Sequence, residues 1–421
     1  MHTKRRWGAM LVSPYKPGGT PRHLAGRERE LQAIRDYLAP VIAYGEKADA
    51  QMVLHGPRGI GKTSVMAAAA EEARATGFLV AWTSCRRQEA FLADLAHSVE
   101  RELRRAGVNL PAKRWKLTVD RVGMEVAVPA LAKVSAEVKR GTQPTPPAGV
   151  VSAVEDLLHE AAAAAAGTAG SHGAGVGLLV AIDELHAGDP GELAVLLNAS
   201  QNLNRERGQN PVALLGAGLP STLGTLTSAA TFGERSRWLG LPELRDEDLA
   251  DAIIAPASEL GVTWDPAAVQ MALAASHHYP HFVQVMGNAV WLAARPEDGH
   301  TIGVEHARAG IRAGTAEVTD LHRARWGSLT AAEKRIAATI AGLGRDEVVS
   351  RSAIEAAVGG DISPFRARLL DKAVLEDVGR GRLRFTLPGF ADFVLAETHL
   401  GTPDEPHELP TARPQLGRGP R

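Results

Sequence analysis

The stretch QMVLHGPRGIGKTSVMA, residues 51–67, decides how the chain folds. Three apolar residues at 52–54 predict a short strand, and an alanine-rich segment from Lys62 predicts a helix. Between them, residues 56–63 read G-x-x-x-x-G-K-T. The glycines let successive backbone N–H groups turn inward around phosphate oxygens, where side chains would leave no room. The stretch therefore predicts a strand–loop–helix unit that binds a phosphate group.

Each polar group of this loop has an expected role. The helix that begins near Lys62 directs its positive end at the phosphates, and the Lys62 ammonium reaches the β- and γ-phosphates. The Thr63 hydroxyl is expected to bind Mg²⁺, so the predicted ligands are ATP and Mg²⁺. A chance glycine-rich turn is the alternative, but the strand before it and the helix after it favour the phosphate loop. The predicted nucleotide-binding residues here are Gly56, Pro57, Arg58, Gly59, Ile60, Gly61, Lys62, Thr63 and Ser64.

A second motif follows the apolar run at 178–182, which ends in Asp183 and Glu184. So short an apolar run suits a strand at the centre of a parallel sheet, where both faces are buried. The Asp183 carboxylate is expected to hold Mg²⁺ together with Thr63. Glu184 is expected to polarise the attacking water as a general base. An acidic pair can also cap a helix, but the buried run before it favours the catalytic interpretation.

Strands and helices alternate from residue 23 to about residue 244, which predicts an α/β fold with a doubly wound parallel sheet. A purely helical pattern follows, and then a helix-rich module that ends in two short strands. The predicted domains are a basic irregular arm at 1–22, a phosphate-loop ATPase core at 23–244 with an insertion at 112–150, an all-helical lid at 245–324, a winged helix-turn-helix at 325–400 and a disordered tail at 401–421.

The composition narrows the class of protein. The net charge of −1 over 421 residues excludes a global basic field for nucleic acid, so any such surface must be local. The single cysteine, Cys85, rules out an intramolecular disulfide and fits a reducing cytosol. The longest weakly interrupted apolar stretch, 161–182, contains Gly, Ser, Thr and His and is not expected to cross a membrane. A cytoplasmic protein without membrane contact is therefore expected.

Two further groups of residues are candidates for roles at the site. Arg235 and Arg237 lie far from the loop in sequence, and either could act as an arginine finger donated by a neighbouring subunit. An ion pair with Glu234 is the equally weighted alternative. Histidines cluster at 277–281, but Pro280 disrupts their spacing, so structural histidines are favoured over a metal site.

Several motifs, taken in order, resemble the AAA+ ATPases, specifically the origin-recognition-like group found in many actinobacterial proteins. The resemblance covers about residues 20–400. The motifs are GREREL at 26–31, GPRGIGKT at 56–63, LLVAIDE at 178–184, GAGLP at 216–220, ERSRW at 234–238 and YPHFVQ at 279–284. The resemblance implies that Gly26 and Arg27 border the adenine, that Arg235 or Arg237 serves as the finger, that a helical lid covers the nucleotide, and that a winged helix follows.

The chain departs from this family at two places. Residues 216–218, Gly-Ala-Gly, stand where family members usually carry a polar residue that senses the γ-phosphate. His281 stands where the lid usually offers an arginine. The pair Tyr279-Pro280 resembles instead the GxP element of the STAND signalling ATPases, which implies that Pro280 touches the base. Both departures favour a slow nucleotide switch over rapid turnover.

The C-terminal module carries the expected DNA contact. A capping box at 330–333 opens its first helix, and Pro364 begins the third. Leu383 and Phe385 are expected to face inward. The residues predicted to touch DNA are Arg366 and Arg368 of the third helix and Arg380 and Arg382 of the wing. Acidic residues nearly balance the basic ones, so a protein-packing module is the alternative.

The predicted function is therefore an ATP-binding AAA+ switch, associated with duplex DNA through its winged helix and self-associating with ATP. A STAND-like signalling or defence ATPase, whose winged helix binds an unknown protein partner, is the alternative. A chaperone-type machine is disfavoured because no pore-loop aromatic residues stand at a recognisable place.

Overall fold

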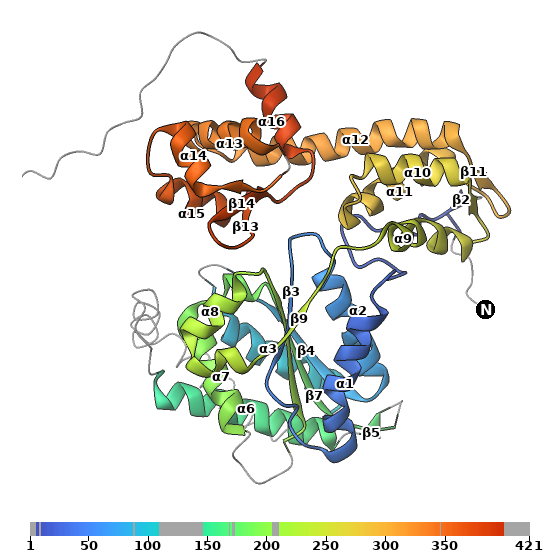
Figure 1. The fold of residues 1–421 in the computed structure, drawn as a ribbon. Helices are drawn as coiled ribbons and strands as arrows, with labels where there is room; N and C mark the ends of the chain where they lie inside the picture. The colour runs from blue at the N-terminus through green and yellow to red at the C-terminus, as the bar shows by residue number, and fades with distance from the viewer. Residues whose placement is uncertain are drawn as a thin grey trace, which may run out of the picture. The chain divides into compact units, whose positions relative to one another are not determined.

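The computed structural model describes residues 6–7, 10–86, 89–108, 146–167, 169–170, 173–203, 210–345 and 347–399 (Figure 1). The chain divides into two compact units, and the main boundary falls between Leu321 and His322. The first unit holds the α/β core and the helical region predicted as the lid, which is called the lid below. The second unit holds the C-terminal module except for residues 376–380, which group with the first unit.

A five-stranded parallel sheet forms the centre of the core, in the order β4-β7-β8-β3-β9. The predicted doubly wound α/β core is thus confirmed. Its strands are β3 (Met52–His55), β4 (Phe78–Ser84), β7 (Gly177–Asp183), β8 (Val212–Gly218) and β9 (Arg237–Gly240). Every residue of β7 and β8 is buried, which explains the continuous apolar run that marks β7 in the sequence.

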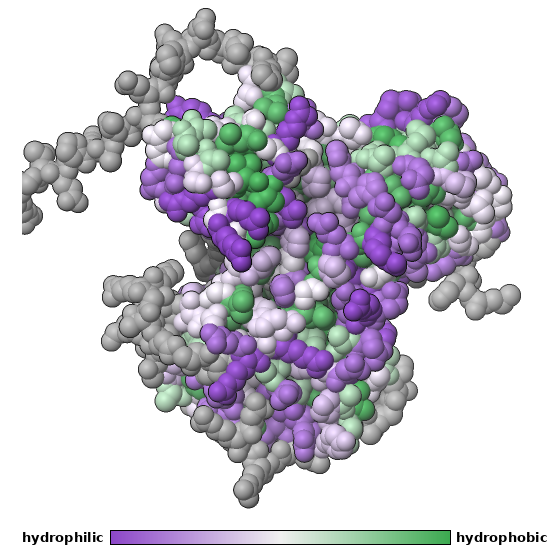
Figure 2. Space-filling view, viewed as in Figure 1, coloured by the Kyte–Doolittle hydropathy of each residue, from purple (hydrophilic) through white to green (hydrophobic). Residues whose placement is uncertain are grey.

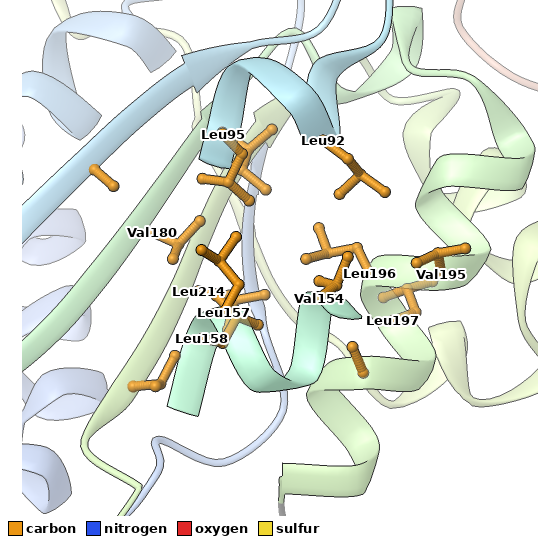
Figure 3. Close-up of a cluster of buried hydrophobic side chains, with 14 of the residues drawn as sticks. Leu92, Leu95, Val154, Leu157, Leu158, Val180, Val195, Leu196, Leu197 and Leu214 are labelled. Carbon is orange, nitrogen blue, oxygen red and sulfur yellow. The ribbon is translucent and has the colours of Figure 1, made fainter. Parts of the chain in front are cut away.

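Helices cover both faces of this sheet (Figure 1). They are α1 (Glu28–Tyr44), α2 (Lys62–Ala75), α3 (Phe91–Arg105), α6 (Ala148–Ala166), α7 (Pro190–Leu203) and α8 (Thr222–Ala229). On one face, α3, α6 and α7 pack their leucines and valines against Val180 and Leu214 of the sheet (Figure 3). On the other, α1 and α2 place Ile34, Val65 and Met66 against the sheet. The phosphate loop is thereby fixed between a buried strand and a buried helix.

Some element boundaries differ from the prediction. Helix α6 begins at Ala148, inside the segment predicted as an insertion. The rest of the predicted insertion, up to residue 145, lies outside the described residues. The core also contains a short antiparallel pair of strands, β5 (Ala169–Gly170) with β6 (Gly173–Ala174). Two 3-10 turns lie in it as well, η1 (Leu185–Ala187) and η2 (Thr231–Arg235). On the face of the core seen in Figure 2, hydrophobic residues are scattered between hydrophilic ones.

The lid is built from α9 (Asp246–Ser258), α10 (Pro266–Ala275), α11 (Pro280–Ala294) and the first part of α12 (Val304–Gly327). It is not purely helical as predicted, because β10 (Thr263–Trp264) and β11 (Thr301–Ile302) form a two-residue parallel pair. Strands this short carry no periodic pattern that a sequence could reveal.

The predicted irregular arm contains a small β1–β2 pair (Arg6–Trp7 with Met10–Leu11) and packs against the lid from Leu11 onward. The Tyr15 hydroxyl donates to the Ile253 carbonyl at 2.6 Å and accepts from Trp264 Nε1 at 3.0 Å. Trp291 Nε1 donates to the Leu11 carbonyl at 3.2 Å. This segment is therefore held to the lid by buried aromatic contacts, although its sequence is rich in Pro, Gly and basic residues.

The C-terminal module consists of four helices and a three-stranded sheet in the order β12-β14-β13. Its elements are α13 (Ala331–Gly344), β12 (Val349–Ser350), α14 (Arg351–Val358), α15 (Ser363–Asp371), β13 (Leu375–Asp377), β14 (Arg382–Phe385) and α16 (Phe390–His399). The predicted capping box of Thr330 and Glu333 is confirmed, and Leu383 and Phe385 are buried as predicted. The winged helix-turn-helix itself stays a prediction, and the predicted tail lies outside the described residues. Among the described helices, none has the length and apolarity needed to cross a membrane.

Candidate nucleotide-binding site

The phosphate loop lies between β3 and α2, and Gly59 and Gly61 adopt positive φ angles of 71° and 99°. Such angles are costly for any residue with a side chain, which explains why glycine stands at both positions. The Lys62 ammonium donates to the carbonyls of Gly56 at 2.9 Å and Pro57 at 2.6 Å. Burial lowers the pKa of Lys62 to about 8, although Glu184 and Asp183 act in the opposite direction.

Two further carbonyls of the loop are bound from outside it. Arg27 is only 2% exposed, and its guanidinium donates to the Ile60 carbonyl at 2.9 Å and to the Pro242 carbonyl at 2.9 Å. The Tyr279 hydroxyl, from the lid, donates to the Arg58 carbonyl at 3.0 Å. Arg27 was expected to border the adenine, and the structure shows that its guanidinium is bound to backbone carbonyls that include one of the loop.

The acidic end of β7 meets the loop. Thr63 Oγ1 donates to Asp183 Oδ2 at 2.8 Å, and the Glu184 N–H donates to Asp183 Oδ1 at 2.8 Å. Burial raises the pKa of Asp183, while the Thr63 hydrogen bond lowers it. A hydroxyl and a carboxylate are the oxygen donors that Mg²⁺ prefers, so this pair fits the predicted metal. Behind it, the Cys85 N–H donates to the Asp183 carbonyl at 2.9 Å, and the Cys85 side chain is buried.

Glu184 has an unusual backbone. Its φ angle is 55°, in the left-handed region that residues with side chains rarely occupy. His186 Nε2 lies 3.2 Å from Glu184 Oε2, and the Glu184 side chain is 44% exposed. The turn after β7 therefore aims Glu184 away from the buried strand, while Asp183 stays beside Thr63.

A cavity of about 270 Å³ opens at the loop. Of the predicted site residues, those that line it are Arg27, Arg58, Gly59, Ile60, Gly61, Lys62, Thr63, Ser64, Glu184 and Pro280. Gly26, Gly56, Pro57 and Asp183 are not among the lining residues. A Cβ on Gly26 would come within 2.5 Å of the Asp248 side chain, so this glycine allows a close approach of α9.

Several residues that line the cavity were not predicted from the sequence. They come from the N-terminal segment and the lid. Lys16 and His23 line the cavity, and so does Gln284, whose Oε1 accepts the Lys16 N–H at 3.1 Å. His281 stands where the lid of similar proteins usually offers an arginine. Its side chain also lines the cavity, and burial lowers its pKa. No motif in residues 16–23 marks them as part of a site, because their position depends on contacts with distant helices.

The end of β8 is closely packed at the two glycines that stand in place of a sensing residue. A Cβ on Gly216 would lie 2.3 Å from Leu185 Cδ1, and one on Gly218 would lie 2.2 Å from Thr222 Oγ1. The side chains of Leu185 and Thr222 would have to shift to admit a side chain at either glycine.

The arginine-finger candidates lie elsewhere. Arg235 ends η2 and Arg237 begins β9, and both are exposed and absent from the lining of the cavity. The clustered histidines do not form a metal centre: within the described ranges, no group of three or more His, Cys, Asp or Glu side chains could hold a metal ion. His278 instead pairs with Asp246 at 2.6 Å.

The predicted DNA-contacting arginines differ in their surroundings. Arg380 and Arg382 are exposed, whereas Arg366 is half-buried. Arg368 lies 3.5 Å from the carboxylate of Glu333, which also binds Lys372 at 2.7 Å. Glu333 is fully buried, so part of the positive charge of α15 is paired within the module.

Comparisons with known proteins agree with this geometry. Residues 23–215 match the family model described as an AAA ATPase domain, and residues 319–394 match a domain of unknown function. A Walker-type ATPase of Pyrococcus abyssi has a similar fold, with 14% identity and a TM-score of 0.55 over 89% of this chain and 97% of that chain. The Orc2 protein of Aeropyrum pernix, solved in ADPNP and ADP complexes, shares 15% identity with a TM-score of 0.50 over 92% and 98% of the two chains.

No curated protein matches the sequence. The sequence match to an AAA ATPase domain is confined to residues 23–215, and the similarity to Orc2 is a similarity of fold.

Proposed function

We propose that the protein binds ATP with Mg²⁺ at the phosphate loop and hydrolyses it slowly, as a nucleotide-dependent switch. The observation that carries this proposal is the hydrogen bond from Thr63 to Asp183. It joins two predicted Mg²⁺ ligands that lie 120 residues apart in the chain. Both side chains offer oxygen atoms as ligands. Asp183 ends strand β7, and Thr63 lies in the first turn of α2, after the loop that follows β3.

Each polar residue of the site has its own role in ATP binding or hydrolysis. The Lys62 ammonium neutralises charge on the β- and γ-phosphates, and Thr63 with Asp183 holds the metal. When bound, Mg²⁺ supplies positive charge to the phosphates. Glu184, which lines the cavity, orients water for attack on the γ-phosphate. The sequence Gly-Ala-Gly at residues 216–218, which offers no polar side chain to sense the γ-phosphate, supports slow turnover.

Two variants test this assignment. Lys62→Ala should abolish binding or hydrolysis of ATP, and Glu184→Gln should bind ATP normally but fail to cleave it in a single turnover. Glu305→Gln, at a lid glutamate that is 81% exposed, serves as the control and should behave as wild type. Wild-type nucleotide affinity and turnover in Lys62→Ala would refute the site.

We further propose that the C-terminal module is a winged helix that contacts duplex DNA. The exposed side chains of Arg380 and Arg382 support this proposal, since phosphate contacts require accessible cations. The STAND-like alternative, in which the module packs against protein, is favoured by the ion pairs of Arg368 and Lys372 with buried Glu333.

Salt-dependent binding separates the two functions. In gel shifts of the full chain with ATP, Arg380→Ala and Arg382→Ala should each flatten the salt dependence by about one unit of slope, whatever the DNA sequence. Arg308→Ala, at an exposed lid arginine, is the control. If the full chain binds no duplex DNA at low salt, the module is a protein-packing element.

A further inference from the structure

The side chain of Tyr279, from the lid, contacts the phosphate loop. Its hydroxyl donates to the Arg58 carbonyl at 3.0 Å. The end of its ring lies directly over Gly59, where an added Cβ would be 1.8 Å from the hydroxyl and 2.1 Å from Cζ. Gly59 thus provides the space in which the lid reaches the loop.

This contact fixes the direction of a phosphate-binding amide. None of the described peptide bonds is cis, so the carbonyl of each points away from the N–H of the same peptide. Holding the Arg58 carbonyl at the outer side of the loop directs the Gly59 N–H to the inner side, where a phosphate loop binds its ligand. A hydrogen bond to the carbonyl also polarises the peptide and makes its N–H a stronger donor.

Arg27 makes the same kind of contact two residues further along the loop. Its guanidinium holds the Ile60 carbonyl at 2.9 Å, which directs the Gly61 N–H inward by the same geometry. Arg27 belongs to the segment that begins α1, whereas Tyr279 belongs to the lid. One of the two supports is thus part of the core, and the other depends on the position of the lid.

Tyr279 is itself held firmly within the lid. The two residues before it, His277 and His278, both have positive φ angles, and Pro280 begins α11 immediately after it. The Tyr279 ring packs edge-on against Phe282, at 4.9 Å between ring centroids, and Phe282 is fully buried. A strained turn and a buried neighbour therefore determine where the hydroxyl lies, so that it follows the lid and does not move freely.

We propose that Tyr279 is a positioning residue through which the lid orients the Gly59 N–H for nucleotide phosphate. The affinity for phosphate then depends on lid closure, and phosphate binding in turn stabilises the lid contact by the same free energy. This inference rests on the proposed nucleotide binding and adds to it the route by which the lid is coupled to the loop.

Tyr279→Phe removes only the hydroxyl, so it tests the contact with little other change. One hydrogen bond of ordinary strength predicts a loss of ADP affinity of about two- to tenfold, measured by calorimetry. Adenosine, which lacks phosphate, should bind Tyr279→Phe and wild type equally. Tyr37→Phe is the matched control, because Tyr37 also donates to a carbonyl, that of Leu214 at 2.9 Å, inside the core. It should leave both affinities unchanged.

Amide hydrogen exchange of the nucleotide-free protein gives a second measurement. Residues 58–61 should exchange faster in Tyr279→Phe than in wild type or Tyr37→Phe, because the loop has lost one support. Unchanged ADP affinity and unchanged exchange in Tyr279→Phe would overturn the inference, and so would an equal loss of ADP and adenosine affinity. If wild type itself binds no ADP, the proposed function fails as well, which distinguishes the two failures.

Discussion

Lys62 titrates near the pH at which nucleotide binding is normally measured. Burial lowers the pKa of its ammonium to about 8, so above that pH the free protein holds a neutral amine. Binding of phosphate restores the charge and must take up a proton. We therefore expect the affinity for ADP to fall by up to about tenfold per pH unit above pH 8.

Calorimetry at pH 7, 8 and 9, in buffers with different ionisation enthalpies, measures both the affinity and the proton uptake. Uptake should rise towards one proton per site at pH 9. An affinity that stays constant from pH 7 to pH 9 would show that Lys62 remains charged in the free protein.

Glu192, near the start of α7, gives the core a pH-dependent stability. Its carboxylate accepts the Leu92 N–H at 3.1 Å, and burial raises its pKa from 4.5 to about 7. The folded state therefore binds more protons than the unfolded state between these values, so the free energy of unfolding falls as pH rises from 4.5 to about 7 and then levels off. The loss contributed by this group is at most about 3 kcal/mol.

Urea unfolding between pH 4.5 and 8 tests this dependence against Glu192→Gln, which keeps an acceptor for Leu92 but does not titrate. The difference in unfolding free energy between the two proteins should change with pH in the stated direction. A difference that is independent of pH would contradict the assignment to Glu192.

At the scale of elements, Glu333 joins α13 to α15. It accepts the Thr330 N–H at 2.8 Å in the capping box and pairs with Lys372 at 2.7 Å, although it is fully buried. Glu333→Ala removes a cap and leaves polar partners without their acceptor, so we expect a loss of about 2 kcal/mol in the stability of the C-terminal unit. Thr330→Ala removes one cap hydrogen bond and should cost about 1 kcal/mol.

Hydrogen exchange of residues 331–371 at increasing urea measures both losses within the full chain. The order matters: Glu333→Ala should be the more destabilising of the two. Equal effects would indicate that Lys372 and Arg368 contribute nothing measurable to this joint.

Elements with a strong local pattern were predictable. Strand β7 and the start of α2 at Lys62 fall where the sequence places them, because a short apolar run and an alanine-rich segment mark them. The burial of Tyr15 was not predictable, since it depends on Trp264 and Trp291, which lie far along the chain. The same holds for Tyr279, whose contact with Arg58 joins residues that lie 221 positions apart in the chain.

In the site, too, some contacts were predictable from the sequence and others were not. The pairing of Thr63 with Asp183 followed from the rule that ligands bind at the carboxyl ends of parallel strands. The binding of Arg27 to the Ile60 carbonyl did not, because no sequence pattern distinguishes a guanidinium that contacts a base from one that supports a loop.

For the whole molecule, the exposed arginines before and in β9 predict that hydrolysis depends on assembly. Arg235 and Arg237 do not line the cavity of their own chain, as expected of a finger that completes a neighbour's site. ATP should promote self-association, and Arg235→Ala or Arg237→Ala should lower turnover without lowering ATP affinity.

Turnover per chain measured over a range of protein concentrations, beside sedimentation with and without ATP, tests this expectation. Arg308→Ala, exposed on the lid, is a suitable control for the loss of a surface arginine. Turnover that is independent of concentration, together with wild-type behaviour of both variants, would exclude a finger donated in trans.

The burial of Cys85 has a practical consequence for testing the proposed coupling between the lid and the phosphate loop. It is the single cysteine of the chain, it is 2% exposed, and burial raises the pKa of its thiol, so the native protein offers thiol-reactive dyes almost nothing to modify. Cysteines introduced at Ile42 on α1 and Leu292 on α11, both exposed, would take up dyes selectively. Energy transfer between such a pair would then report in real time how the lid moves against the core as nucleotide binds and leaves.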